Sequence, residues 1–346
     1  MSLTESAYQA RKIVKYGGIF LTGLFLFLFF GLGMVSAYKR AHPIKEVPNL
    51  RYGILPRIIF PEKQFEKKGF TFEFPNDVTP KMPDQAKVYI VFRSDKSFWA
   101  LEQEKINAKD LGFESEPQQI SNGVYEFQNA ANQKLRVNIL DGSFKLSYPY
   151  ANDPSLLTTG KVPSQNDAID LAKSYLQKAN KWQSDFDDGE RKVTFWKFEN
   201  DSLKPVSAVV DANFVRVDFA RKKIDTQIEI VSAEKSQSLV SVLLSGATVG
   251  EKQVVEVNYR YTNIDRESFA TYPIKTIEQA MSELRAGNYF PASDAASPSI
   301  IIRKVYLAYF EPVTLTNYMQ PIFVFEGDNN FSAYVPAITS QFTNKD

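Results

Sequence analysis

The longest apolar stretch of the chain covers residues 17–38 and reads GGIFLTGLFLFLFFGLGMVSAY, without a charged side chain. Basic residues flank it on both sides. At 1.5 Å per residue, a helix of this length crosses a hydrocarbon core about 30 Å thick. No other stretch of the chain approaches it. The pattern predicts a short cytoplasmic tail (residues 1–16), a single transmembrane helix (residues 17–38) and about 300 residues beyond it.

The flanking charges do not settle the orientation of this helix. Arg11, Lys12 and Lys15 precede it, but the opposite flank is also basic. A short basic tail favours an N-terminus inside the cell, because charges next to long translocated domains count for less. We therefore expect an uncleaved signal-anchor in the cell membrane with extracytoplasmic C-terminal domains. A cleaved signal peptide is the alternative, since Val35-Ser36-Ala37 matches a small-x-small cleavage site, although its apolar core is longer than usual.

Residues 39–64 interrupt the regular patterns. Pro43, Pro48, Pro56 and Pro61 follow at short intervals, which excludes a continuous helix. We expect an extended linker here, with residues 57–60 as a short strand or a docking segment.

A membrane-proximal domain is expected over residues 65–160. Phe70, Phe72 and Phe74 alternate with polar residues, as in a half-buried strand. A buried strand (87–92) and a helix (97–111) that stops at Gly112 follow. Strands are then expected at 123–128, 133–140 and 144–150, with Asp141-Gly142 as a hairpin turn.

Two further modules begin with a capped helix. Ser164 caps the first, in a module covering residues 161–270, and Thr276 with Gln279 forms a capping box in the second, covering residues 271–346. The expected strands of the first are 192–199, 206–211, 214–220, 225–232, 238–244 and 253–261. Those of the second are 300–310, 321–326 and 332–336, after a helix that ends at Gly287. A helix followed by an antiparallel meander therefore occurs twice, and the fold class is α+β.

Composition limits the chemistry that these modules can perform. The chain has 41 basic and 40 acidic residues, no cysteine and one histidine, His42. Near-neutral charge argues against a nucleic-acid partner. Without cysteine there are no disulfides, thiol nucleophiles or thiolate metal sites. A histidine base inside a folded domain is not available either.

The two capped helices resemble the openings of PepSY-like domains. They read PSQNDAIDLA at 163–172 and YPIKTIEQA at 272–280. The C-terminal stretches YMQPIFVFEG (318–327) and SAYVPA (332–337) are similar to the end of YycH/YycI-type proteins. The resemblance covers about residues 160–340. It implies a single-pass membrane protein whose extracellular domains modulate a sensor histidine kinase, and it brings no catalytic residues with it.

Few motifs suggest a chemical site, and we predict no catalytic residue, metal or cofactor. The acidic run 185–190 has oxygen ligands for calcium, but its spacing departs from the calcium loop and favours a solvated loop. Residues 246–252 imitate a phosphate loop without its spacing. Basic residues at 216 and 221–223 could meet anionic lipid or cell-wall polymer, or simply face solvent. The candidate partner surface consists of Arg216, Arg221, Lys222, Lys223, Tyr306 and Phe310, the last two being sheet core if buried.

The leading functional hypothesis is a non-enzymatic membrane-anchored envelope protein that binds another protein in a regulatory or scaffold role. Residues 17–38 contact the bilayer, and a membrane protein or a second copy of the chain is the expected partner. One alternative is an envelope ligand-binding protein or a carboxylate-dependent hydrolase acting on cell-wall glycans, because two carboxylates suffice for that chemistry. Another is a PepSY-type protease inhibitor.

Overall fold

The structure is a computed structural model that describes residues 3–41, 47–92, 99–225, 227–233, 238–248, 250–293, 295–312, 314 and 316–344. The chain divides into two compact units, residues 1–48 and 49–346. His42, the single histidine, lies outside the described residues.

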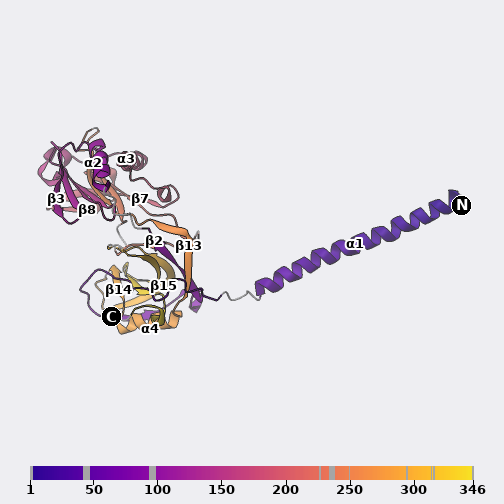
Figure 1. Cartoon of the computed structure of the whole chain (residues 1–346). Coiled ribbons are helices and arrows are strands. Elements are labelled where there is room, and N and C mark those ends of the chain that lie inside the picture. The colour runs from indigo at the N-terminus through magenta and orange to yellow at the C-terminus, as the bar shows by residue number, and fades with distance from the viewer. Residues whose placement is uncertain are drawn as a thin grey trace. The chain divides into compact units, whose positions relative to one another are not determined.

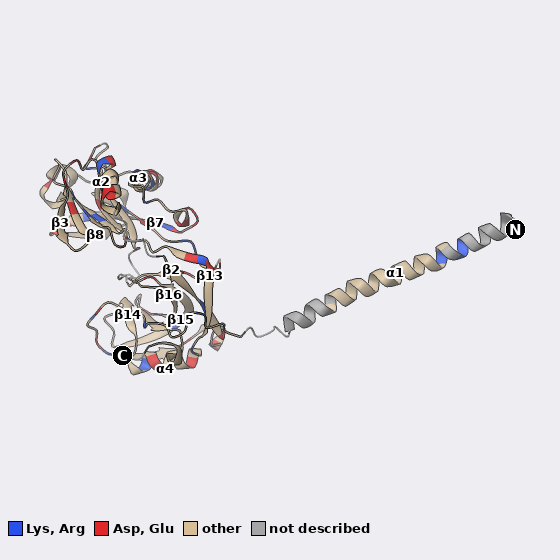
Figure 2. Ribbon diagram, in the orientation of Figure 1, with Lys and Arg blue, Asp and Glu red and all other residues tan. Residues whose placement is uncertain are grey.

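The first unit is the helix α1 (Leu3–Ala41). Its stretch Val14–Leu32 is long and apolar enough to cross a membrane, and none of it is buried against protein. Figure 2 shows this stretch almost free of charge, with basic residues near its start. The structure confirms a helix that is long and apolar enough to cross a membrane. It does not separate an anchor from a signal sequence, which can have the same length and composition.

The second unit contains two lobes, each built on its own sheet (Figure 1). The nine-stranded lobe has the strand order β3-β4-β5-β6-β12-β11-β9-β7-β8. All of its strand pairs are antiparallel. Its strands are β3 (Gln118–Ser121), β4 (Val124–Gln128), β5 (Lys134–Asn138), β6 (Phe144–Ser147), β7 (Arg191–Glu199), β8 (Ser202–Val206), β9 (Phe214–Phe219), β11 (Val240–Ser245) and β12 (Val254–Tyr259).

Two helices contribute to the main core on one face of this sheet. They are α2 (Ala100–Asp110) and α3 (Gln165–Lys178). The Ser164 hydroxyl accepts the Asp167 N–H at the start of α3, which satisfies one of the free donors of the first turn. Ala168, Ala172 and Leu176 are fully buried, as their helical spacing predicts.

The eight-stranded lobe has the central order β1-β15-β16-β17-β14, with β10 on β15 and with β2 joining β16 to β13. β1 and β10 run parallel to β15, whereas the other pairs are antiparallel. Its strands are β1 (Gly69–Phe72), β2 (Gln85–Val91), β10 (Ile230–Val231), β13 (Ile264–Pro273), β14 (Phe290–Ser293), β15 (Ser299–Phe310), β16 (Tyr318–Gly327) and β17 (Ser332–Pro336).

The helix α4 (Ile277–Ala286) packs on this second sheet. The capping box of Thr276 and Gln279 is present at its start. Gly287 ends it with φ 85°, a left-handed conformation that favours glycine. The fold class is thus α+β, with a helix packed on an antiparallel or mostly antiparallel sheet in each lobe.

The expected module boundaries are wrong, because strands pair with partners far away in the sequence. Residues 65–160 do not form a domain: β1 and β2 belong to the eight-stranded lobe, whereas β3 to β6 belong to the nine-stranded lobe. The boundary at residue 160 falls inside one sheet, since β6 pairs with β12. The strand β13 supplies the partner of β2, although no strand was expected at residues 264–273.

The expected linker also differs from the structure. From Asn49 onward it lies along the eight-stranded lobe. The Leu55 N–H donates to the Phe342 carbonyl at 2.8 Å, and the Leu55 side chain is fully buried. The Phe60 ring stacks on Phe290 with centroids 4.9 Å apart. Prolines prevent a helix but leave apolar side chains free to cover a sheet, so this segment completes the core of the lobe.

Two expected strands are shifted or shortened. The strand expected at 206–211 lies earlier, at β8, and residues Val209–Asp211 form a short 3-10 helix. The strand expected at 225–232 contracts to β10. The remaining expected strands are confirmed within a few residues at their ends.

Candidate functional site

A buried group of charges joins the two lobes. Arg221 follows β9, Asp185 precedes β7, and Glu311 follows β15. The Arg221 guanidinium lies 3.0 Å from the Asp185 carboxylate and 3.1 Å from that of Glu311. The side chains of Arg221 and Glu311 are only 6% and 3% exposed. We call Asp185, Arg221, Tyr261, Arg266 and Glu311 the junction cluster.

The other members satisfy the remaining hydrogen-bonding groups of the junction cluster. The Tyr261 hydroxyl donates to Asp185 at 3.0 Å, and Arg266 lies 3.2 Å from the same carboxylate. The Thr262 N–H donates to Glu311 at 2.8 Å, while the Thr262 carbonyl accepts from Arg221 at 2.6 Å. Buried charges are tolerated when they are paired and hydrogen-bonded in this way.

The pKa values in the junction cluster follow from these contacts. Burial by itself would raise the pKa of Asp185, but Arg221, Arg266 and the Tyr261 hydroxyl outweigh it and hold that pKa below its usual value. Burial and the adjacent Asp185 carboxylate raise the pKa of Tyr261 to about 12, even though Arg221 opposes this. Asp185 and Arg221 are therefore charged around neutral pH, and Tyr261 keeps its proton as a hydrogen-bond donor.

The acidic run 185–190 is thus distributed among separate partners. Asp187 pairs with Lys173 at 2.8 Å, and Asp188 pairs with Lys222 at 2.7 Å. Within the described residues, no group of three or more His, Cys, Asp or Glu side chains could hold a metal ion.

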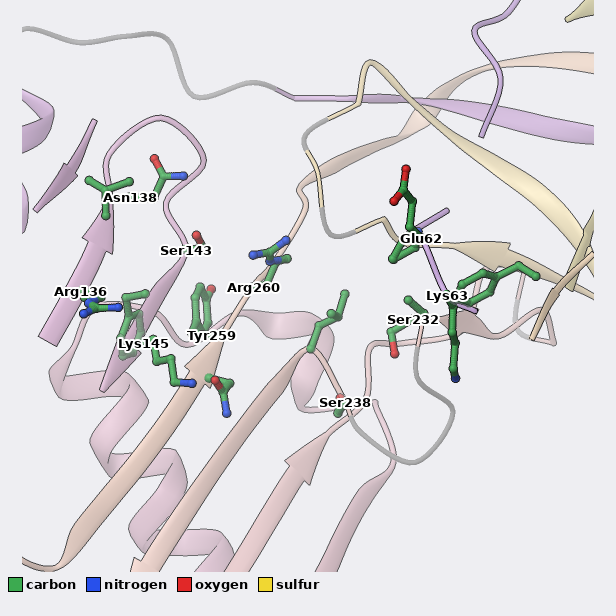
Figure 3. A pocket seen from close by; sticks show the side chains of 17 residues that line it. Glu62, Lys63, Arg136, Asn138, Ser143, Lys145, Ser232, Ser238, Tyr259 and Arg260 are labelled. Atoms are coloured by element: carbon green, nitrogen blue, oxygen red, sulfur yellow. The ribbon is translucent and has the colours of Figure 1, made fainter. Parts of the chain in front are cut away.

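A cleft of about 640 Å³ opens between the lobes. The nine-stranded lobe contributes Arg136, Lys145 and Arg260, whereas the eight-stranded lobe contributes Glu62, Lys63 and the buried ring of Phe290. Figure 3 shows Arg260 near its centre, with Arg136 and Lys145 to one side and Glu62, Lys63 and Ser232 to the other. The cleft volume lies within the range typical of ligand sites.

Positive charge dominates the lining of this cleft. Glu62 is the one carboxylate against Lys63, Arg136, Lys145 and Arg260 among the lining residues that the structure describes. Arg136 is paired with Glu126 at 2.6 Å, and the Lys63 ammonium donates to the Pro291 carbonyl at 3.1 Å. The apolar part of the lining comes from Pro61, Val124, Phe144, Ala233, Leu239 and Phe290.

Arg260 and Lys145 differ from these paired cations. In the described part of the chain, Arg260 has no ion pair, and its Nη1 atom is buried without a hydrogen-bond partner. Lys145 is exposed and also has no ion pair with any described residue. A buried guanidinium nitrogen without an acceptor costs about 1–3 kcal/mol or more. Arg260 as a whole is only partly buried and lines the cleft, so its uncompensated charge favours an anion there.

The strand register explains why charges gather here. One residue from each successive strand lines up across the sheet on the face away from the main core: Glu126, Arg136, Lys145, Asn258, Ser241, Asp218 and Lys192. Arg136 and Lys145 are direct cross-strand neighbours, and like charges in that position are destabilising. Burial raises the pKa of Asp218, although Arg216 at 3.0 Å opposes it.

A second cavity of about 280 Å³ also borders Arg260 and contains several carboxylates. Most of them already have partners. Asp218 pairs with Arg216, Glu229 with Lys223, and Glu311 with Arg221, while Glu326 accepts the Tyr306 hydroxyl. No two of these carboxylates are left together for general acid–base chemistry.

The residues expected to form a partner surface do not share one exposed face. Phe310 is 2% exposed and belongs to the core of the eight-stranded lobe, in line with the sheet-core alternative. Tyr306 is partly buried against the same core. Arg221 is enclosed in the junction cluster. Lys222 and Lys223 are exposed but carry ion pairs.

Arg216 is the remaining member of that expected surface. It stacks on the Trp196 ring with its guanidinium carbon 4.5 Å from the ring centroid. Its side chain is also paired with Asp218, so both its charge and its planar face are engaged within the nine-stranded lobe.

Sequence reasoning missed Lys145 and Arg260. The alternation around the Asp141-Gly142 turn carried a usable signal for Lys145, because that hairpin register places it opposite Arg136. Arg260 offered no comparable signal, since only the pairing of distant segments places it in the cleft.

Comparisons with known proteins give no family. No family model matches the chain, and no curated protein sequence matches it. The crystal structure of an uncharacterized protein from Eubacterium rectale ATCC 33656 is similar with a TM-score of 0.42 and 11% identity, covering 78% of this chain and 89% of that one. The Bacillus megaterium YpeB C-terminal domain has a TM-score of 0.30 and 12% identity, covering 69% of this chain and 92% of that one. At these scores neither likeness assigns a fold or a function.

Proposed function

We propose that this chain is a non-enzymatic, single-pass membrane protein whose two-lobed unit binds another protein in a regulatory or scaffold role. The observation that supports a binding role is the open cleft between the lobes, in which Lys145 and Arg260 have no partner among the described residues. A site built from unpaired cations and apolar side chains suits recognition of a ligand more than bond cleavage.

The helix α1 supports a membrane placement of this unit. Its apolar stretch Val14–Leu32 is not buried against protein and is long enough to cross a bilayer. We place the two-lobed unit on the extracytoplasmic side, and the resemblance to PepSY-like and YycH/YycI-type proteins makes a membrane sensor kinase the first partner to test.

Topology is tested by cysteine labelling, because the chain contains no cysteine of its own. Lys304 is 65% exposed, so Lys304→Cys gives a single reactive site on the two-lobed unit. A membrane-impermeant maleimide should label this variant in intact cells. A cysteine in the predicted cytoplasmic tail, Arg11→Cys, should react only after the cells are opened. The reverse pattern contradicts the proposed placement.

Partner binding is tested by photocrosslinking in the native membrane. A photoreactive residue at Lys145 should give a discrete adduct with one membrane protein, whereas the same residue at exposed Lys109 on α2 should not. Isolation of the chain in mild detergent as a monomer without any adduct would contradict a protein-binding role.

A further inference from the structure

We propose that the cleft between the lobes binds an acidic peptide segment, with Arg260 receiving a carboxylate at its base and Lys145 a second one at its rim. This rests on the proposed protein-binding function and adds to it the chemistry of the partner. The cleft, the Arg260 and Lys145 charges in its lining that have no ion pair with a described residue, and the strand register are the observations that support it.

Arg260 determines the charge of the ligand. Its guanidinium stays protonated in proteins and presents several donors in a fixed plane. The Arg260 backbone N–H is bound to the Leu239 carbonyl at 2.9 Å, which holds the start of this side chain in place between β12 and β13. Arg260 is partly buried, lines the cleft and forms no ion pair with a described residue, so an anionic oxygen is the group that best compensates its charge.

Lys145 adds a second position next to the first. It faces Arg136 across the β5–β6 pair, and Arg136 has Glu126 on its far side. Glu126 contacts both Arg136 and Lys134, and Lys145 forms no ion pair with a described carboxylate. An anion placed between Lys145 and Arg260 would relieve the like-charge contact as well as pairing both cations.

The apolar lining favours a peptide over a bare phosphate or a phosphate polymer. Val124, Leu239 and Phe290 border the same cleft as the cations. A peptide that carries Asp or Glu between apolar residues can contact both kinds of surface. An inorganic phosphate or a glycerol-phosphate chain would pair the cations and leave these side chains without a partner.

The test uses the full chain in detergent micelles and a fluorescent peptide of repeating Glu-Leu-Asp-Phe units. A peptide with Gln and Asn in place of Glu and Asp is the neutral control. We expect saturable binding of the acidic peptide that weakens as salt is raised, and no binding of the neutral one. Equal binding of both peptides would overturn the proposal.

Variants locate the binding in the cleft. Arg260→Gln should weaken it about tenfold or more, because it removes a charge-assisted contact within the cleft, and Lys145→Gln should weaken it less, because Lys145 is exposed to solvent. Arg260→Lys should retain part of the affinity. Lys109→Gln, an exposed cation on α2, should bind as the original chain does. If all four variants bind equally and have unchanged far-ultraviolet circular dichroism, the cleft is not the site.

Competition experiments distinguish an acidic peptide from other anions as the ligand of the cleft. Sodium phosphate, a glycerol-phosphate polymer and vesicles containing anionic lipid are added at matched charge. Unlabelled acidic peptide, added at the same charge concentration, is the reference competitor. If the polymer or the vesicles displace the fluorescent peptide where the unlabelled peptide does not, the peptide assignment is overturned. A dimer of the chain that Arg260→Gln dissociates would instead identify the occupant as a second copy and overturn a foreign partner.

Failure of this proposal can be told apart from failure of the proposed function. A crosslinked membrane partner that Arg260→Gln still retains leaves the protein-binding function intact and removes the cleft as its site. Peptide binding that depends on Arg260, together with a complete lack of membrane partners, supports the cleft chemistry and contradicts the regulatory or scaffold role.

Discussion

Arg221 and Arg260 show two uses of the same side chain within one unit. Arg221 is enclosed by Asp185, Glu311, the Tyr261 ring and the Thr262 carbonyl. Arg260 follows β12 only two residues before Thr262, yet its Nη1 atom has no partner among the described residues. The first arginine joins the lobes through ion pairs, and the second forms no ion pair with a described residue. The same residue type is thus fully paired at one position and leaves a buried nitrogen without a described partner at the other.

The largest expected effect is on the junction cluster. Glu311→Ala should lower the free energy of unfolding by about 3–5 kcal/mol, because it leaves the buried Arg221 charge with one carboxylate fewer. Urea unfolding of the full chain, followed by tryptophan fluorescence, measures this. Trp182 packs on Phe186 and Phe219 close to the cluster, so its signal reports on this region. Lys222→Ala, on the exposed neighbour, is the control and should change little.

The stability that Asp185 gives to the junction cluster should be lost at acid pH and retained at neutral pH. The pKa of Asp185 is lowered in the folded state, so its contribution to stability is present above the unfolded pKa of about 4 and is lost as the pH falls through the folded value. Asp185→Asn should therefore be clearly less stable than the original chain at pH 7. The difference should shrink as the pH falls below about 4. Urea titrations at several pH values measure it, and a constant difference would contradict the pairing.

Replacing Arg260 should not lower the free energy of unfolding, in contrast to replacing Glu311 or Asp185. Arg260→Met keeps much of the length and removes a buried donor that has no partner. The free energy of unfolding should stay the same or rise by about 1 kcal/mol. A loss of about 3 kcal/mol, comparable with a broken buried pair, would mean that Arg260 is also structural and would undermine the comparison.

The smallest effect is expected at Lys145. Lys145→Glu turns a like-charge cross-strand contact with Arg136 into an opposite-charge one, so stability should rise by about 0.2–1 kcal/mol. Thermal unfolding is precise enough to detect the upper part of this range. An unchanged or lower midpoint would indicate that the strand register does not bring these two charges into contact.

Local patterns predicted the elements well. The caps at Ser164 and Thr276, the stop at Gly287 and the strands around the Asp141-Gly142 turn all lie where the sequence placed them. These signals depend on residues a few positions apart. By contrast, β13 and β14 went unrecognised, because Pro291 interrupts the pattern of β14 and the partners of both strands are distant in the sequence.

The sequence by itself determined an apolar helix, two capped helices, most of the strands and a chain without cysteine chemistry. Only the tertiary structure decided that β1 and β2 join the C-terminal sheet, that residues from Asn49 onward cover this sheet, and that Arg221 is buried and paired while Arg260 forms no ion pair with a described residue. The physical reason is that helix caps, turns and alternation act over a few residues. Strand pairing and charge burial depend instead on which distant segments meet, and that is decided when the whole core forms.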